Sequence, residues 1–237
     1  MNANARWQEV ISENLACSSI PGFKRQELSF EAVHAGMAAQ PGLGTSASAL
    51  VPRSSLFTNF APGEMRATGV STDVAIEGQG FFAVQLPDGQ TGYTRDGEFQ
   101  LNSTGELVTK QGFPVLGDTG TIQIDRNLSG ALTISATGEV SQGEEVRGRL
   151  RIVDFDNPRL LRQSNGGTFV ATHPDLMATD VASPSVRQGF LESANTSPAT
   201  EMASLITAMR SFEAGQKLLH SQDERMARVI SELGNPN

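Results

Sequence analysis

The sequence predicts a mainly β fold: an antiparallel β central domain, flanked by N- and C-terminal α-helices that form a coiled-coil-like pair. Three observations predict it. Short apolar runs separated by turn residues fill the middle of the chain, an apolar helical face lies near the N-terminus, and a long heptad pattern occupies the C-terminus. Between the short runs there is no helical pattern of about 10–15 residues, which argues against parallel βαβ units.

The N-terminal segment has the spacing of an amphipathic helix. Trp7, Ile11 and Leu15 recur every four residues, so that they share one helical face. The sequence Ile20-Pro21-Gly22-Phe23 ends the helix, because a residue before proline avoids helical geometry and Pro-Gly suits the centre of a type II turn. After a short further pattern, residues from about Gly36 to Ala49 are rich in Ala, Gly and Ser, which is typical of a linker.

The central segment changes from the helical period to short strand-like runs. Turn signals such as Pro87-Asp88-Gly89 and Asn165-Gly166-Gly167 recur between them, as in antiparallel meanders. We expect strands at Val74–Ile76, Phe81–Leu86, Gly92–Arg95, Phe99–Leu101, Glu106–Thr109, Phe113–Leu116, Thr121–Ile124, Leu132–Ser135 and Leu150–Phe155.

The C-terminal segment gives the clearest pattern. Ser197 can cap a helix whose first residue is Pro198, and Gly234 and Pro236 end it. Ten residues occupy heptad positions a and d, and eight of them are apolar: Met202, Leu205, Met209, Phe212, Gln216, Leu219, Asp223, Met226, Ile230 and Leu233. This periodicity alone fits a partner interface and an intramolecular core stripe about equally. The polar members, Gln216 and Asp223, either fix the register or lie at a solvated rim.

These patterns divide the chain into four parts. Residues 1–36 form an N-terminal helix and turn, residues 37–67 a linker, residues 68–187 a β-rich domain, and residues 188–237 the long C-terminal helix with its approach.

Composition excludes several classes of function. The net charge of −8 argues against a nucleic-acid surface. Cys17 is the only cysteine, and the three histidines, His34, His173 and His220, have neither metal-ligand nor triad spacing. Apolar runs are too short for a membrane span, and the first ten residues lack the pattern of a cleaved secretory signal. We therefore expect no catalytic residue, metal, cofactor or small-molecule substrate.

Three separated blocks carry a resemblance to a known family. The chain resembles the bacterial flagellar basal-body rod and hook proteins, in particular the proximal and distal rod subunits. The blocks are Ile11-Ser-Glu-Asn-Leu-Ala-Cys-Ser-Ser-Ile-Pro-Gly-Phe-Lys-Arg25; Asp73-Val-Ala-Ile-Glu-Gly-Gln-Gly-Phe-Phe82 with Tyr93-Thr-Arg-Asp-Gly-Glu-Phe99 and Gly112-Phe-Pro-Val115; and Gln188-Gly-Phe-Leu-Glu-Ser-Ala-Asn195 followed by Arg210-Ser-Phe-Glu213.

The resemblance implies a structural subunit of a self-assembling periplasmic tube that transmits torque for motility. It implies export by the flagellar type III apparatus without a cleaved signal, and contacts with copies of itself and with other rod and hook subunits. It favours an assembly interface at Trp7, Ile11, Leu15, Met202, Leu205, Met209, Phe212, Leu219, Met226, Ile230 and Leu233. The alternative function is a secreted β-rich binding or adhesin module with a coiled-coil stalk.

The sequence departs from the family pattern at three places. Relatives usually carry further residues before the position of Asn2, so we expect a shorter N-terminal helix here. Cys17 stands where they usually have a small or polar residue. The segment from Met37 to Thr68 is short, which favours a proximal-rod type.

Overall fold

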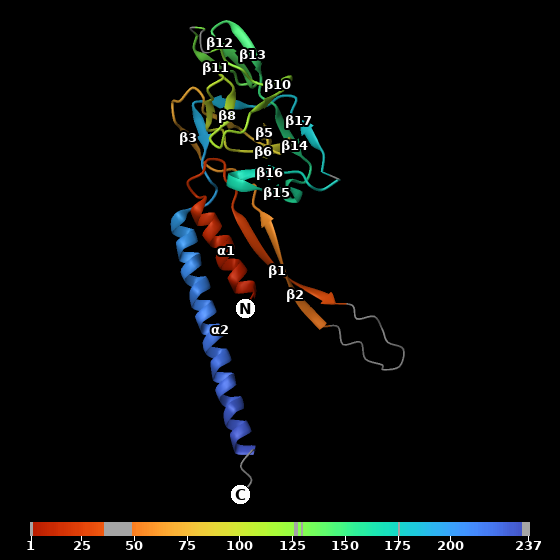
Figure 1. Ribbon diagram of the computed structural model, residues 1–237, viewed down its shortest axis with the longest axis vertical. Coiled ribbons are helices and arrows are strands. Elements are labelled where there is room, and N and C mark those ends of the chain that lie inside the picture. The colour runs from red at the N-terminus through yellow and green to blue at the C-terminus, as the bar shows by residue number, and fades with distance from the viewer. Residues whose placement is uncertain (1, 36–48, 126–127, 129, 175, 234–237) are drawn as a thin grey trace, which may run out of the picture. The chain divides into compact units, whose positions relative to one another are not determined.

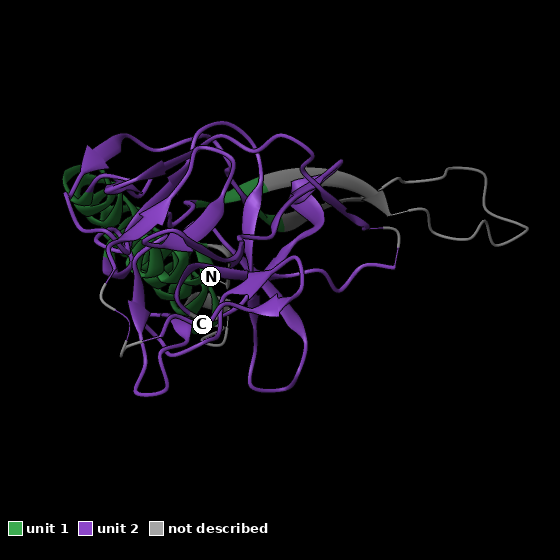
Figure 2. Cartoon of the chain, turned by 90° about the horizontal axis from the view of Figure 1, so that it is seen from above, with its two compact units in different colours: residues 1–15, 26–57, 198–237 green, residues 16–25, 58–197 purple. Residues whose placement is uncertain are grey.

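The computed structural model describes residues 2–35, 49–125, 128, 130–174 and 176–233 (Figure 1). The chain divides into two compact units, each built from segments that are far apart in the sequence (Figure 2). Unit 1 comprises residues 1–15, 26–57 and 198–237, and unit 2 comprises residues 16–25 and 58–197.

Unit 1 contains two helices and a two-stranded sheet. Helix α1 (Asn2–Ala16) and helix α2 (Pro198–Leu233) confirm the two predicted terminal helices. Strands β1 (Gln26–Ala35) and β2 (Ala49–Thr58) pair with each other. Within this unit α1 runs beside the first half of α2 in the opposite direction (Figure 1). Pairing of the coiled-coil kind stays a prediction.

The expected linker over residues 37–67 stays a prediction, although the structure places strands among the residues that it describes there. Strand β2 and the short strand β3 (Met65–Ala67) both lie in that range, and residues 36–48 lie outside the described residues. The linker was inferred from the Ala, Gly and Ser content of residues 36–49, and β2 itself contains Pro52, which lacks a backbone hydrogen-bond donor. A two-stranded ribbon tolerates this loss, since each of its strands has one unpaired edge.

Unit 2 is built from short antiparallel strands. A six-stranded sheet has the order β15-β16-β6-β5-β14-β17, and the strands β11, β12 and β13 form a separate meander. The remaining strands form two-stranded ladders, β9 with β10, β4 with β18, β3 with β19 and β7 with β8. Strand bounds are β4 Val74–Ile76, β5 Phe81–Gln85, β6 Thr91–Thr94, β7 Phe99–Leu101, β8 Leu107–Thr109, β9 Leu116–Gly117, β10 Gly120–Thr121, β11 Leu132–Ile134, β12 Glu139–Gln142, β13 Glu145–Arg149, β14 Ile152–Phe155, β15 Arg162–Gln163, β16 Thr168–Val170, β17 Ala178–Asp180, β18 Val186–Gln188 and β19 Phe190–Glu192.

The core of unit 2 consists of two apolar clusters. The larger one joins aliphatic residues such as Val74, Leu107 and Ile152 with Phe82 and Phe99, whose rings meet edge to face at 5.1 Å. The second is aromatic, with Phe81 in contact with Phe60, Phe155 and Phe169 at centroid distances of 5.2 to 5.9 Å within the group. Such edge-to-face pairs add to the free energy of apolar burial. Unit 2 therefore has a core that contains no residue of either helix.

Candidate assembly interface and the buried charge cluster

One face of α1 is buried and the other is exposed. Ile11 is 2% exposed, and Trp7 and Leu15 are half-buried, so the three predicted interface residues share the protected side. Val10 and Asn14 are buried on the same side, at 5% and 1%. The spacing 7, 10, 11, 14 is the helical repeat that the sequence predicted, now with a polar member.

Asn14 fixes the end of α1 to the start of β1. Its side-chain nitrogen donates to the carbonyl oxygen of Gln26 at 2.8 Å, and its side-chain oxygen accepts the backbone N–H of Gln26 at 2.9 Å. A reciprocal pair of this kind satisfies a buried amide completely on both sides of the contact. Sequence reasoning counted Asn14 only as part of a motif, although its place on the apolar helical face was a usable signal.

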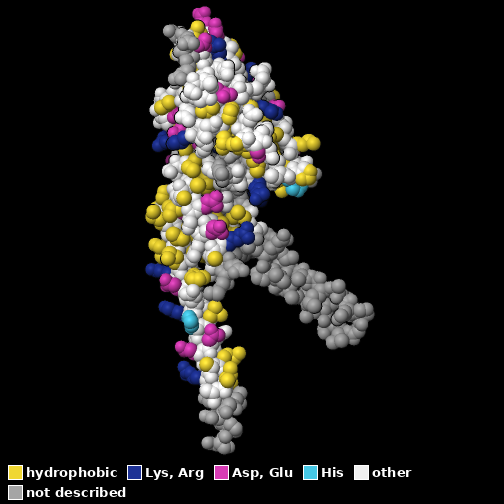
Figure 3. Space-filling view, viewed as in Figure 1, with side chains coloured by type: hydrophobic (Ala, Val, Ile, Leu, Met, Phe, Trp, Pro, Cys, Tyr) yellow, Lys and Arg dark blue, Asp and Glu magenta, His cyan; other side chains and the backbone are white. Residues whose placement is uncertain are grey.

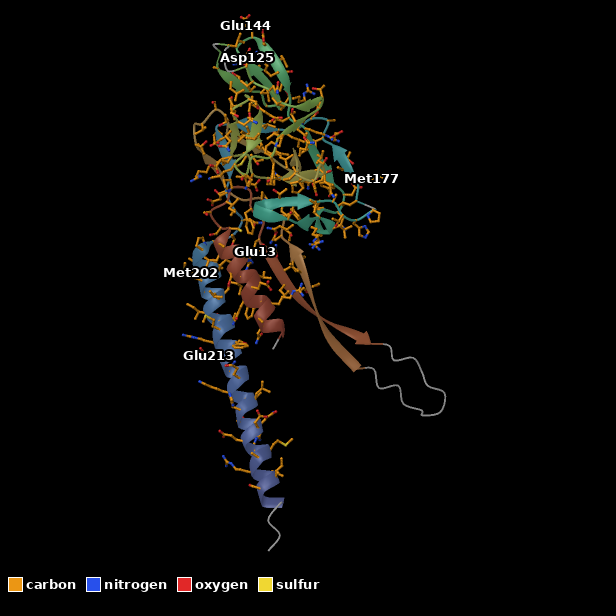
Figure 4. The ribbon with its side chains drawn as sticks, viewed as in Figure 1. Glu13, Asp125, Glu144, Met177, Met202 and Glu213 are labelled. Atoms are coloured by element: carbon orange, nitrogen blue, oxygen red, sulfur yellow. The ribbon has the colours of Figure 1, made fainter. Side chains whose placement is uncertain are left out.

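The first half of α2 has two apolar sides with different environments. Glu201, Ala208 and the half-buried Leu205 and Phe212 lie along one protected side. Met202, Ile206 and Met209 lie about 100° around the helix and are 53%, 53% and 51% exposed. We call these three residues the methionine patch. Hydrophobic side chains gather along this part of α2 in Figure 3, and Met202 is labelled in Figure 4.

The second half of α2 exposes its apolar residues. Leu219, Met226 and Ile230 are 46%, 67% and 70% exposed, and they continue the protected side of the first half along the helix. We call these three residues the distal stripe. Gln216 and Asp223 are exposed as well, and the burial of Leu233 lies outside the described residues. The predicted heptad seam is thus divided between one protected segment and two exposed apolar surfaces.

A second feature lies wholly within unit 2, where the three sequence blocks meet. Lys24 of the first block donates to Glu192 Oε1 of the third block at 2.5 Å. Arg95 of the second block donates to Glu192 Oε2 at 3.3 Å. Lys24, Arg95 and Glu192 are 1%, 7% and 2% exposed, and we call these three residues the buried charge cluster. Lys24 also donates to the carbonyl oxygen of Ala61 at 2.9 Å.

Backbone contacts reinforce this meeting point. The N–H of Gly22 donates to the carbonyl oxygen of Glu192 at 2.7 Å, and the Asn195 side chain accepts the N–H of Arg25 at 2.7 Å. Gly22 has a φ of 66°, and a Cβ there would lie 2.2 Å from the carbonyl carbon of Arg95. Only glycine fits, which explains the Pro-Gly pair; its turn is closed by Phe23 N–H donating to the Ile20 oxygen at 3.3 Å.

Burial dominates the electrostatics of these cations. It lowers the pKa of Lys24, and the charge and hydrogen bond of Glu192 oppose that change. It also lowers the pKa of Arg95, against the opposing charges of Glu192 and then Asp154. Glu192 favours the charged form of both side chains, so this carboxylate is the group that makes their burial tolerable.

Neither feature resembles an enzyme centre. In the described part of the chain, no group of three or more His, Cys, Asp or Glu side chains is arranged to hold a metal ion. Among the same residues no helix combines the length and apolarity that a membrane crossing requires. Cys17 is half-buried.

Comparison with known proteins agrees with this assignment. The model of the flagellar hook protein FlgE/F/G D1 domain matches residues 75–142, and that of the flagellar basal body rod FlgEFG protein C-terminal matches residues 187–232. The flagellar basal-body rod protein FlgG of Buchnera aphidicola is 34% identical, with 94% of this chain and 92% of that protein covered.

The chain belongs to the flagellar basal-body rod protein family. The FlgF rod proteins of Caulobacter vibrioides and Salmonella typhimurium are also 34% identical, over 97% and 94% of this chain and 92% and 90% of their own lengths. Relatives named FlgG and FlgF therefore match equally well, and the resemblance inferred from the three sequence blocks is confirmed. The matched regions include Arg95 and Glu192 of the buried charge cluster.

Proposed function

We propose that this chain is a structural subunit of the flagellar basal-body rod, and that it assembles with copies of itself and with other rod subunits through α1 and α2. Membership of the rod family carries the first part of the proposal. The exposed methionine patch and distal stripe support the second, because unpartnered apolar helical surfaces of this length are unfavourable in water.

The two sides of the first half of α2 suggest a division of contacts. Trp7, Ile11 and Leu15 would cover the side of α2 that carries Leu205 and Phe212 within one subunit. The methionine patch and the distal stripe would then be buried against neighbouring subunits. Heterologous contacts of this kind propagate into a helical tube when they do not close into a ring.

The remaining elements of the proposal follow from the family. The subunit would be exported by the flagellar type III apparatus without a cleaved signal and would act in the periplasm, where a stiff tube transmits torque. It would need neither an enzymatic activity nor nucleic acid. Family membership favours this role over the alternative, a secreted adhesin with a coiled-coil stalk.

The test separates assembly from folding. A strain that lacks this gene is complemented with the wild type, with Met209→Asp or with Ile230→Asp, and swimming in soft agar and basal bodies in electron micrographs are recorded. Both side chains are at least half-exposed in the subunit, so the substitutions leave its folding intact, as circular dichroism would check. In an assembled apolar contact, an unpaired carboxylate costs several kcal/mol, and we expect loss of rods and of swimming.

The matched controls are Ser211→Asp and Ser221→Asp, which place the same charge at exposed positions outside both surfaces. We expect both controls to swim normally. Normal swimming by both apolar-surface variants would contradict the assembly proposal, and equal loss in the controls would show that the helix faces are assigned wrongly.

A further inference from the structure

Glu192 is the carboxylate that forms hydrogen bonds with both cations of the buried charge cluster. Its Oε1 accepts from Lys24 at 2.5 Å and from the backbone N–H of Gly63 at 2.8 Å, and its Oε2 accepts from Arg95 at 3.3 Å. Lys24 precedes it by 168 residues and Arg95 by 97. Removing Glu192 would leave two cations buried beside each other with no opposite charge between them, which is strongly unfavourable.

The other contacts of Arg95 do not supply a charge. Its NH1 and NH2 nitrogens donate to the carbonyl oxygens of Ile76 and Gly78, and its guanidinium lies 5.5 Å from the ring centroid of Phe81. These groups hold the side chain in place within the segment formed by β4, β5 and β6. Arg95 is therefore positioned by its near neighbours, and the carboxylate that forms an ion pair with it is the distant Glu192.

The strands around Glu192 depend on the same distant segment. Strand β3 pairs only with β19, and β4 pairs only with β18, in the ladders of the described residues. By contrast, β5 and β6 form a local hairpin, and β11, β12 and β13 form a local meander. Local pairs lose less chain entropy on closing than pairs about 120 residues apart, so they form earlier.

We propose that the entry of Glu192 between Lys24 and Arg95 is the closing step of folding in unit 2. The hairpin and the meander form first, and β3, β4 and the Gly22–Arg25 segment become fixed only when residues 186–195 arrive. Asn195 completes the step, because its side chain bonds the N–H of Arg25 and the carbonyl oxygen of Asn59. This proposal concerns folding and does not rest on the proposed assembly.

The consequence is a unit that stays open until nearly the whole chain is available. A chain that emerges from its N-terminus first, as in synthesis, cannot close unit 2 before residue 192 has appeared. Residues 16–25 and residues 58–197 of unit 2, which β1 and β2 separate in the sequence, are then joined in the same step.

The test measures folding and unfolding rates of the full-length chain, below the concentration at which it associates. We expect Glu192→Gln to lower the equilibrium constant for folding by about 100-fold or more. Nearly all of that change should appear as faster unfolding, with the refolding rate within about twofold of the wild type, because a contact absent from the transition state affects only unfolding. Stopped-flow mixing with urea, followed by far-ultraviolet circular dichroism, gives both rates.

Two variants provide the comparison. Val84→Ala removes buried methyl groups from the β5–β6 hairpin, so it should slow refolding. Glu145→Gln makes the same chemical change at an exposed carboxylate, which pairs with the half-buried Arg147, and both rates should stay nearly unchanged. If Glu192→Gln does not fold, Lys24→Met is the milder substitute, because it leaves Glu192 paired with Arg95. We again expect faster unfolding and a nearly unchanged refolding rate.

The results that would overturn the proposal are specific. If the refolding rate of Glu192→Gln fell by nearly the same factor as its equilibrium constant for folding, the contact would form early in folding. The same result for Lys24→Met would count in the same way where that variant replaces Glu192→Gln. An equilibrium constant equal to that of the wild type would show that the cluster does not stabilise unit 2.

Discussion

Asp96 makes the stability of unit 2 depend on pH. Its side chain is buried, at 5% exposure, and burial raises its pKa from 3.8 to about 6. Charge repulsion from Glu98 and Asp73 raises the pKa further. The hydrogen bond from the N–H of Glu98, at 2.9 Å, and the charge of Lys110 both lower it. Asp96 therefore keeps its proton up to a higher pH in the folded state than in the unfolded state.

The sign of the effect follows from proton binding. Between pH 3.8 and about 6 the folded chain binds more protons at this site than the unfolded chain, so the free energy of unfolding falls as pH rises. The fall is complete above pH 6, and the difference between the two pKa values corresponds to about 3 kcal/mol. Asp96→Asn removes this charge and keeps the oxygen that accepts from Glu98.

We expect Asp96→Asn to raise the free energy of unfolding at pH 7.5 by about 1–3 kcal/mol, and to have little effect at pH 4. Urea titrations of the non-associated subunit at pH 4, 5, 6 and 7.5, followed by circular dichroism, measure the difference at each pH. The control is Asp88→Asn, since Asp88 is exposed and accepts a similar bond from the N–H of Gln90 at 3.0 Å. A gain from Asp96→Asn that is the same at all four pH values, or a loss at pH 7.5, would refute the reasoning.

Two further predictions concern the architecture. Deleting residues 198–237 removes α2 and leaves Glu192 and Asn195 in place, so unit 2 should keep its β circular dichroism, and limited proteolysis should yield a stable fragment that ends near residue 197; loss of all β signal would contradict the division. Gly22→Ala should destabilise unit 2 by more than about 2 kcal/mol in urea titration, because its Cβ meets the Arg95 backbone. Gly69 has a φ of 72° and open space around it, so Gly69→Ala should lower the free energy of unfolding by less than Gly22→Ala does. Equal losses in the two variants would show that the positive φ, and not the contact with Arg95, determines the cost.

Local patterns in the sequence predicted the elements that local interactions determine. Strands β4 and β7 have the expected bounds, β5 ends one residue before its expected end, β6 begins and ends one residue early, and α2 begins at Pro198 as expected. Helix α1 ends at Ala16, somewhat before the Pro-Gly turn. Apolar alternation and turn residues are enough in these cases, because the information lies within about ten residues of each element.

Three of the missed strands depend on distant partners, whereas β12 and β13 were missed although they belong to a local meander. Strands β3, β18 and β19 are each three residues long, which is too short to show a clear alternation of apolar and polar residues. Each is defined by its pairing with a segment more than 100 residues away. The charged members of the cluster were not recognised as partners, since Lys24, Arg95 and Glu192 entered the sequence analysis only as parts of the three family blocks. A lysine is seldom buried without a partner, and its partner here is 168 residues away.

The family motifs acquire a physical explanation from this meeting point. Gly22 and Lys24 come from the first block, Arg95 from the second, and Glu192 and Asn195 from the third, and each contacts a member of another block. Gly22 is needed for close backbone approach, the cations for the carboxylate, and Asn195 for two backbone groups. The motifs that identify the family therefore contain residues whose contacts join the three sequence blocks within unit 2.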